Sequence, residues 1–263
     1  AINGGHVITV SGNNATRVFN VTAGNVTFDS LTIISGTVTT NDCGGFGSYT
    51  CGGGIMIQNS SVVVTVSNST LSDNSANNHG GGIYNWHGTI TISNSTLSGN
   101  SADNDGGGIY NSGGTLMIDN STLSRNSANR GGGIFNYLST VAIDNSTLSG
   151  SSATSIGGGI YNYLSTVEID NSTISDNSAN VGGGINTDEG TVTVTNSTIS
   201  GNWAGNSGGG IYTSEGTLAI DNSTLSDNSA VAYGGGINNL QGTLMVNNST
   251  IFGNQAGNSI ISG

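Results

Sequence analysis

Short stretches of alternating apolar and polar residues recur along almost the whole chain. One copy of the recurring unit reads GGGIYN at residues 106–111, GTLMID at 114–119 and NSTLS at 120–124. Strict alternation over a few residues is typical of strands that bury one face. Each copy offers three such strands, for example at residues 82–85, 89–93 and 96–100.

The copies follow one another at a nearly constant spacing. A triple glycine opens each of eight copies, and its first residue is Gly52, Gly80, Gly106, Gly131, Gly157, Gly182, Gly208 or Gly234. A fixed period of about 26 residues predicts a solenoid, in which each coil buries its apolar face only against its neighbours. Three strands per coil predict an all-β parallel β-helix of nine to ten rungs.

This pattern predicts one domain over residues 1–263. We expect opening coils at 1–35, a surface insert at 36–51, regular repeats at 52–256 and a C-terminal tail at 257–263. Alternation places Ile83, Ile90, Ile92 and Leu97 inside, and places the residues between them outside.

Asparagine keeps one position in nearly every copy, interrupted only by Ser151. Stacked amides can hydrogen-bond from rung to rung, so the column predicts a structural ladder. Its members are Asn74, Asn100, Asn126, Asn177, Asn202, Asn228 and Asn254.

Cys43 and Cys51 are the only cysteines, eight residues apart in the predicted insert. They favour a local disulfide and hence an oxidising compartment, and the alternative is two free thiols in a flexible loop. Two cysteines without further ligands nearby do not complete a zinc site.

Charge excludes several partners. The chain has 45 glycines, no proline, 15 acidic residues and three arginines, Arg17, Arg125 and Arg130, giving a formal net charge of -12. That balance repels phosphate backbones and anionic lipids, so we expect no nucleic-acid binding. No apolar run approaches the roughly 18 residues of a membrane span, so we expect no membrane insertion.

Candidate catalytic residues are few. The chain has no lysine, Arg125 and Arg130 fall in variable turns, and His79 and His87 fall in turns that other copies fill differently. Some polysaccharide lyases and hydrolases also have the parallel β-helix fold. Their chemistry needs a general base or a pair of carboxylates. The repeat hardly breaks, so we expect no enzyme and no cofactor.

Carboxylates recur at Asp119, Asp144 and Asp170 on consecutive copies. The column is either a solvated acidic stripe, which we favour, or a site where calcium bridges the rungs.

Aromatic and hydroxyl columns offer two further interpretations. Tyr84, Tyr110, Phe135, Tyr161 and Tyr212 form an outward aromatic column, which either stabilises the solenoid by stacking, as we favour, or presents a carbohydrate platform. Repeated Thr-x-Ser stretches leave ice binding open as an alternative.

Glycosylation acceptors are numerous. We expect the repeated Asn-Ser-Thr asparagines, such as Asn94, to sit at a corner and point inward. The irregular acceptors Asn14, Asn20 and Asn59 are therefore the better glycosylation candidates.

The string LSGNSADNDGGGIYN at residues 97–111 resembles the GGA(I/L/V) and FxxN repeats of the polymorphic outer-membrane proteins, a family of autotransporter adhesins. Gly107, Gly108 and Ile109 match GGAI with glycine in place of alanine, and Leu97 and Asn100 lie where that family has Phe and Asn. The chain is also similar to bacterial secreted and surface right-handed β-helix repeat proteins, and this similarity implies a right-handed coil. The resemblance implies a non-catalytic, passenger-like surface module.

These observations predict an extracellular or cell-surface structural or adhesive rod, with end-to-end self-association into a filament and surface glycans as further partners. The alternatives are an adhesin passenger fragment, a solenoid that binds carbohydrate or ice, and a β-helix polysaccharide lyase or hydrolase.

Overall fold

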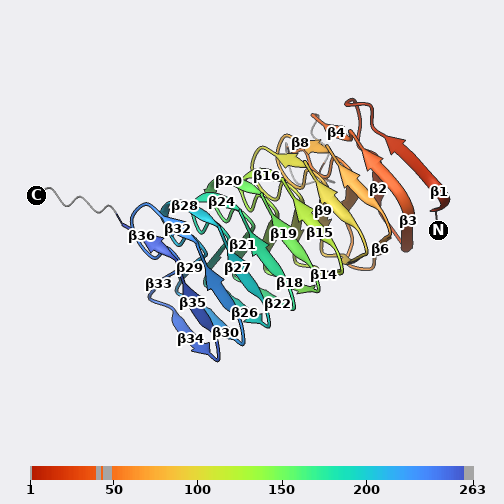
Figure 1. Ribbon diagram of the computed structural model, residues 1–263. Helices are drawn as coiled ribbons and strands as arrows, with labels where there is room; N and C mark the ends of the chain where they lie inside the picture. The colour runs from red at the N-terminus through yellow and green to blue at the C-terminus, as the bar shows by residue number, and fades with distance from the viewer. Residues whose placement is uncertain (1, 40–42, 44–48, 258–263) are drawn as a thin grey trace, which may run out of the picture.

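The structure is a computed structural model that describes residues 2–39, 43 and 49–257. In the described residues every named element is a β-strand, and the coils stack into a rod with the N-terminal rungs at one end and the C-terminal rungs at the other (Figure 1). All pairings between neighbouring rungs are parallel, for example β10 with β14 and β13 with β17. The predicted parallel β-helix with a repeat of about 26 residues is confirmed.

The largest sheet has 18 strands. Its longer strands are β1 (Ile2–Ser11), β3 (Asn25–Ile34), β6 (Val63–Ser67), β10 (Thr89–Ser93), β14 (Thr115–Asp119), β18 (Thr140–Asp144), β22 (Thr166–Asp170), β26 (Thr191–Thr195), β30 (Thr217–Asp221) and β34 (Thr243–Asn247). Its shorter strands are β7 (Thr70–Ser72), β11 (Thr96–Ser98), β15 (Thr122–Ser124), β19 (Thr147–Ser149), β23 (Thr173–Ser175), β27 (Thr198–Ser200), β31 (Thr224–Ser226) and β35 (Thr250–Phe252).

Two further sheets of nine strands each complete the coil. The sheet that follows the triple glycines contains β2 (Phe19–Val21), β5 (Ile55–Ile57), β9 (Ile83–Trp86), β13 (Ile109–Ser112), β17 (Ile134–Tyr137), β21 (Ile160–Tyr163), β25 (Ile185–Asp188), β29 (Ile211–Ser214) and β33 (Ile237–Leu240). The other contains β4 (Thr37–Val38), β8 (Ser75–Ala76), β12 (Ser101–Ala102), β16 (Ser127–Arg130), β20 (Ser152–Ile156), β24 (Ser178–Val181), β28 (Trp203–Ser207), β32 (Ser229–Ala230) and β36 (Gln255–Ala256).

A typical coil therefore has four strands in three sheets, one strand more than the alternation predicts. The extra strand is the pair Ser101–Ala102, which is too short to show a period. A corner at Asn94 separates β10 from β11, and its backbone φ of 49° lies in the left-handed region that asparagine tolerates better than most residues.

The core is a continuous column of aliphatic side chains inside the coil. The inward positions predicted from alternation, Ile83, Ile90, Ile92 and Leu97, are completely buried. Like residues stack on like, because the register between rungs is kept without slips through β10 and β14. Such contacts exist only between neighbouring rungs, so one coil has no independent core.

The triple glycine lies where the chain turns into the next sheet and passes very close to other backbone segments. Gly80 adopts a φ of 64°. A Cβ on Gly81 would lie 2.2 Å from the carbonyl oxygen of Ser101, which is far inside van der Waals contact. Glycine is therefore required at both positions by local geometry.

The predicted bounds of the insert, 36–51, include residues that belong to rungs. Gly36 donates its N–H to Asn74 Oδ1 at 2.9 Å, and β4 pairs with β8, so residues 36–38 belong to a rung. Cys51 also pairs in register with His79. Residues 40–42 and 44–48 of the insert, and 258–263 of the predicted tail, lie outside the described residues.

No helix in the described part of the chain has the length and apolar character needed to cross a membrane.

Candidate functional site

The predicted asparagine column forms a buried ladder. Asn100 Nδ2 donates to Asn126 Oδ1 at 3.1 Å and to the carbonyl oxygen of Leu71 at 3.1 Å. Backbone N–H groups along the ladder also donate to side-chain oxygens of the next rung, as Asn100 does to Asn126 at 3.0 Å. At the interruption, Ser151 Oγ accepts from the Asn126 N–H at 3.3 Å. These residues stabilise the rungs internally and are not available to a ligand.

Sequence reasoning missed two further ladders. Asn85 Nδ2 donates to Asn111 Oδ1 at 2.7 Å, and Asn111 Nδ2 donates to Asn136 Oδ1 at 3.0 Å. In the Asn-Ser-Thr triplet the serine is buried, and the Ser95 N–H donates to Ser121 Oγ at 3.0 Å. The signal was present in the nearly constant residue at each of these positions.

The expectation that Asn94 and its equivalents point inward is wrong. The asparagine of each triplet forms the left-handed corner, and that conformation directs its side chain to solvent. The glycosylation candidates Asn14, Asn20 and Asn59 are exposed as well, so exposure does not distinguish them from the repeated triplets.

Asp119, Asp144 and Asp170 occupy one column in register. Corner asparagines bridge them, because Asn171 Nδ2 lies 3.2 Å from Asp144 Oδ1 and 3.0 Å from Asp170 Oδ2. Neutral amide donors thus reduce the repulsion between these carboxylates. Within the described ranges, no group of three or more His, Cys, Asp or Glu side chains is arranged to hold a metal ion.

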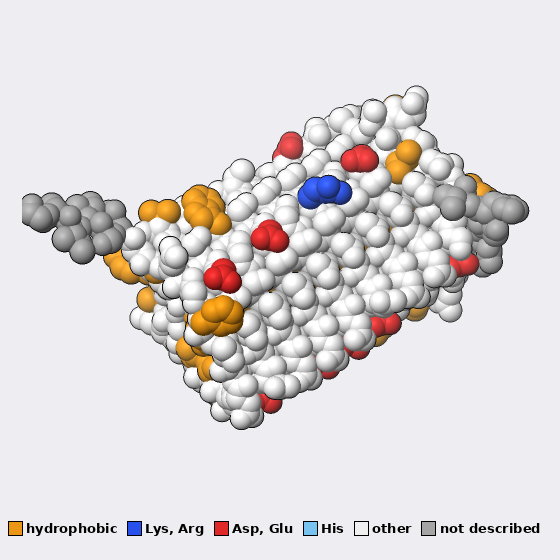
Figure 2. Space-filling model, in the orientation of Figure 1, with side chains coloured by type: hydrophobic (Ala, Val, Ile, Leu, Met, Phe, Trp, Pro, Cys, Tyr) orange, Lys and Arg blue, Asp and Glu red, His pale blue; other side chains and the backbone are white. Residues whose placement is uncertain are grey.

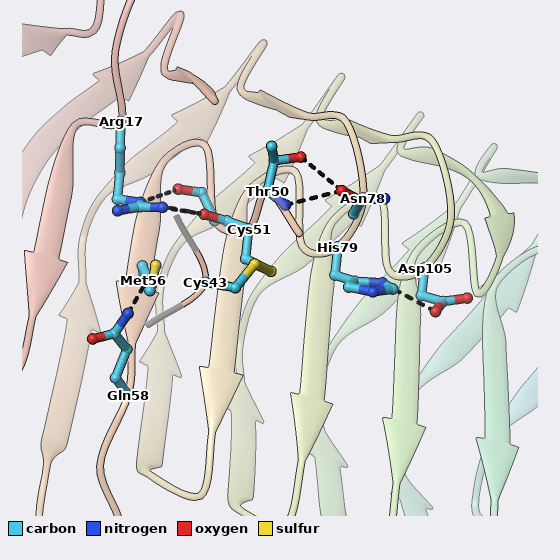
Figure 3. The surroundings of a disulfide bond; sticks show 10 residues. Arg17, Cys43, Thr50, Cys51, Met56, Gln58, Asn78, His79 and Asp105 are labelled. Atoms are coloured by element: carbon cyan, nitrogen blue, oxygen red, sulfur yellow. Dashed lines mark hydrogen bonds and ion pairs between the residues drawn. A yellow bond between two sulfur atoms is a disulfide. The ribbon is translucent and has the colours of Figure 1, made fainter. Parts of the chain in front are cut away.

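Cys43 and Cys51 form a disulfide, so this prediction is confirmed. Figure 3 shows the disulfide and Met56. Both cysteines are buried and belong, with Met56, to an apolar cluster that also contains the aromatic rings of Tyr84, Tyr110, Phe135 and Tyr161. Arg17 holds the same segment by donating to the carbonyl oxygen of Cys51 at 2.7 Å. The disulfide is therefore part of a second apolar cluster outside the coil.

That cluster is the floor of a groove along one side of the rod. Tyr84, Tyr110 and Phe135 project outward from consecutive strands β9, β13 and β17, and their rings stack with centroids 5.0 Å apart. Tyr161 continues the row from β21, and the planes of the Tyr161 and Phe135 rings meet at 69°. All four rings are buried, so the column predicted as outward stabilises the solenoid and cannot serve directly as a carbohydrate platform. Tyr212, the fifth predicted member, is set apart because Asn186 replaces the ring on the rung between.

A charged row borders this floor at the residues just before the triple glycines. His79, Asp105 and Arg130 pair in register on three consecutive rungs. Arg130 donates to Asp105 through Nε at 2.7 Å and through Nη2 at 3.0 Å, and His79 Nδ1 lies 3.1 Å from Asp105 Oδ2 (Figure 3 shows His79 facing Asp105). This position varies from copy to copy, as the sequence indicates, and the fixed period places its variable residues side by side on neighbouring rungs.

The environment of the groove shifts the pKa values of Asp105 and Tyr110. Burial alone would raise the pKa of Asp105, but the hydrogen bonds and charges of His79 and Arg130 hold that pKa below its usual range. Burial, and then the Asp105 charge, raises the pKa of Tyr110 to about 12. The groove at neutral pH therefore contains an ionised carboxylate, a guanidinium and neutral phenol groups.

A second aromatic row forms the outer border. Trp86, Ser112, Tyr137 and Tyr163 occupy one column, and the rings of Tyr137 and Tyr163 stack at 5.5 Å. Between the two borders lies a cavity of about 310 Å³, continuous in its lining with another of about 200 Å³ beside the disulfide. This size falls in the range of ligand sites, roughly 300 to 1,000 Å³. We call this feature the aromatic groove.

The comparisons with known families agree with the architecture. The family described as right-handed beta helix region matches residues 107–263, which is more than half of the chain. The chain belongs to this β-helix family. The match agrees with the right-handed coil that the family resemblance implies.

The Chlamydia polymorphic membrane protein repeat matches residues 68–85 and 94–112, as the resemblance at residues 97–111 suggests. Among curated proteins, no sequence matches this β-helix chain significantly.

Proposed function

We propose that this chain is a non-catalytic β-helical rod at the cell surface, with a structural or adhesive role, whose copies join end to end. The repeat shared with a membrane-protein family supports a surface location. The disulfide supports an oxidising compartment.

The last described rung carries the proposal of end-to-end joining. Its inward side chains Leu244, Val246 and Ile251 are 40%, 38% and 49% exposed, whereas their counterparts one rung earlier are buried. Figure 2 shows hydrophobic side chains gathered at this end of the rod. An apolar layer with unpaired backbone groups is stabilised when another rung covers it, and a second copy offers such a rung.

The first rung fits that requirement. Register from strand to strand leads from Thr9 along the threonine column to Thr250, and from Val10 along the aliphatic column to Ile251. Stacking the first rung of one copy on the last rung of another would continue both columns.

The spacing of the carboxylates near the groove supports a non-catalytic role. Asp105 precedes β13 and Asp188 ends β25, three rungs away, which is about 14 Å along the axis. Glycoside hydrolysis uses two carboxylates roughly 5 to 9.5 Å apart. We expect no release of reducing ends from polysaccharides incubated with the protein.

Electron microscopy of the purified 263-residue protein at neutral pH tests the joining. We expect unbranched fibres with an axial repeat of about 40 to 45 Å, the length of nine rungs. Ile251→Lys places a charge in the uncovered layer and should abolish fibres, whereas Thr198→Lys on the side of the rod should not. Isolated short rods at all concentrations, or fibres that survive Ile251→Lys, would refute end-to-end joining.

A further inference from the structure

Two columns of hydroxyl side chains run along the outward side of the short strands of the largest sheet. Threonine opens and serine closes each of the strands β7, β11, β15, β19, β23, β27 and β31, and these seven strands pair in register without slips. The threonines are Thr70, Thr96, Thr122, Thr147, Thr173, Thr198 and Thr224, and the serines are Ser72, Ser98, Ser124, Ser149, Ser175, Ser200 and Ser226. We call this surface, which is about 29 Å long, the hydroxyl face.

The hydroxyl face is rigid because each of its strands is fixed from below and at both ends. In β11, Leu97 lies between the two hydroxyl residues and is completely buried. Just before the strand, Ser95 donates its backbone N–H to Ser121 Oγ at 3.0 Å. Just after it, Asn100 donates its backbone N–H to Asn126 Oδ1 at 3.0 Å. Threonine is also restricted in its χ1 angle, so covering this face costs little side-chain entropy.

The hydroxyl groups of this face are available to solvent. Thr96 and Ser98 are partly exposed, and neither hydroxyl hydrogen-bonds another group in the described part of the chain. An outward position of the adjoining longer strands is not kept in this way, since Thr91 gives way to Met117 and Glu168 on later rungs. Repetition of the coil therefore does not by itself keep an outward residue constant.

The spacings of the hydroxyl face resemble those of a crystal lattice. Strand geometry places outward positions i and i+2 about 6.7 Å apart and neighbouring rungs about 4.8 Å apart, whereas oxygen atoms on a prism face of hexagonal ice recur about every 7.4 Å and about every 4.5 Å. The two sets of spacings agree to within roughly a tenth. A rigid array with these spacings holds water near ice-like positions. Each rung adds a weak contact, and a rigid array makes these contacts together.

Other ligands fit this face less well. Its two columns carry no charge, so they offer no ionic contact to a charged ligand. They also carry no aromatic ring on which a sugar could stack, and Phe252 replaces serine only on the rung after Ser226. An extended peptide needs a free strand edge, but β11 pairs with β7 on one side and β15 on the other.

We propose that the hydroxyl face binds ice. The threonine and serine hydroxyls and the threonine methyl groups hold a layer of ordered water that joins a prism face of the crystal. The hydroxyl face lies on the side of the rod, so a single chain carries the whole site and binding does not depend on end-to-end joining.

Ice-affinity partitioning and thermal hysteresis of the purified full chain test the proposal. We expect the unmutated chain to be enriched in slowly grown ice and to lower the freezing point of small crystals below their melting point. Thr147→Lys places a long charged side chain in the middle of the face and should abolish both effects. Thr193→Lys is the matched control, because its outward position on β26 lies in the column that carries Met117 and Glu168. It should leave both effects unchanged.

Further variants separate ice binding from folding and from joining. Circular dichroism melts show whether the lysine variants are folded, and Ser149→Lys in the serine column replaces Thr147→Lys if that variant is not. Ile251→Lys, which should block end-to-end joining, should keep the affinity for ice. Loss of joining and loss of ice binding are therefore distinguishable. Exclusion of the unmutated chain from ice, or an equal loss of ice binding in Thr147→Lys and Thr193→Lys, would overturn the proposal.

Discussion

The buried asparagine ladder predicts a large and specific loss of stability in Asn100→Ala. Asn100 Oδ1 accepts from the Asn74 N–H at 3.1 Å and from Asn74 Nδ2 at 3.0 Å, and its own Nδ2 donates to the Leu71 carbonyl. Alanine removes these three bonds and also the bond from Asn100 Nδ2 to Asn126 Oδ1, although Asn74 Nδ2 keeps a bond to the Ile33 carbonyl. A buried polar group left without a partner costs about 1 to 3 kcal/mol, and here the Asn74 N–H and the Leu71 carbonyl are affected. The free energy of unfolding should fall by about 2 to 4 kcal/mol.

The chain supplies its own comparison in Ser151. Because Ser151 Oγ still accepts from a backbone N–H, Asn100→Ser should cost about half as much as Asn100→Ala. Urea unfolding gives both values from the shift in midpoint and the slope. Asn180→Ala, at an exposed asparagine, is the control and should change stability by less than about 0.5 kcal/mol. An alanine variant as stable as the control, or a serine variant as unstable as the alanine variant, would refute the reasoning.

Three further predictions concern single features. Asp105→Asn should lower the free energy of unfolding at pH 7 by about 1 to 3 kcal/mol, because the charge-assisted bonds to Arg130 are lost. The pKa of Asp105 is lowered in the folded state, so the Asp105 carboxylate stabilises the fold fully above the ordinary pKa of 3.8. This stabilisation is lost as the pH falls through the folded-state pKa. A stability difference between Asp105→Asn and the unmutated chain that persists in urea unfolding at the lowest pH contradicts this. Replacing Cys43 and Cys51 by serine should cost about 2 kcal/mol, and the unmutated chain should melt like the variant once a thiol reductant is added. Leu138→Asn should raise the free energy of unfolding by about 1 kcal/mol, because Leu138 is exposed and has a φ of 48°, a left-handed conformation that asparagine tolerates better than leucine. Thermal melts measure the change, and a lower melting temperature for the variant would contradict the prediction.

The fold could be predicted from the sequence because each rung repeats the same short pattern of residues. Alternation at Ile90 and Ile92 assigns the inward face without knowledge of any partner strand. A constant period then aligns identical residues, so the asparagine column could be identified before its hydrogen bonds were seen. Corner geometry could not be derived this way, because the side-chain direction of Asn94 depends on a left-handed φ that alternation does not encode.

The aromatic groove could not be predicted in the same way. Its charged border consists of His79, Asp105 and Arg130, three residues that differ and therefore look like unconstrained turn positions. Stacking brings them within hydrogen-bonding distance, and opposite charges then pair. The burial of the aromatic rings could not be derived either. Only the packed structure shows that the tyrosines of one column are buried while those of the next column are half-exposed. The usable signal was a titratable residue before the triple glycine on three successive copies.

The buried amide ladders give the rod a direction. In both ladders the hydrogen bonds between side-chain amides run one way, toward the C-terminal neighbour, from Asn74 to Asn100 and from Asn85 to Asn111. Aligned amide dipoles add along the axis, so the two ends of the rod differ in electrical polarity as well as in shape. Copies joined end to end would therefore all point the same way. Such a fibre would have two unlike tips, and subunits would add to them at different rates.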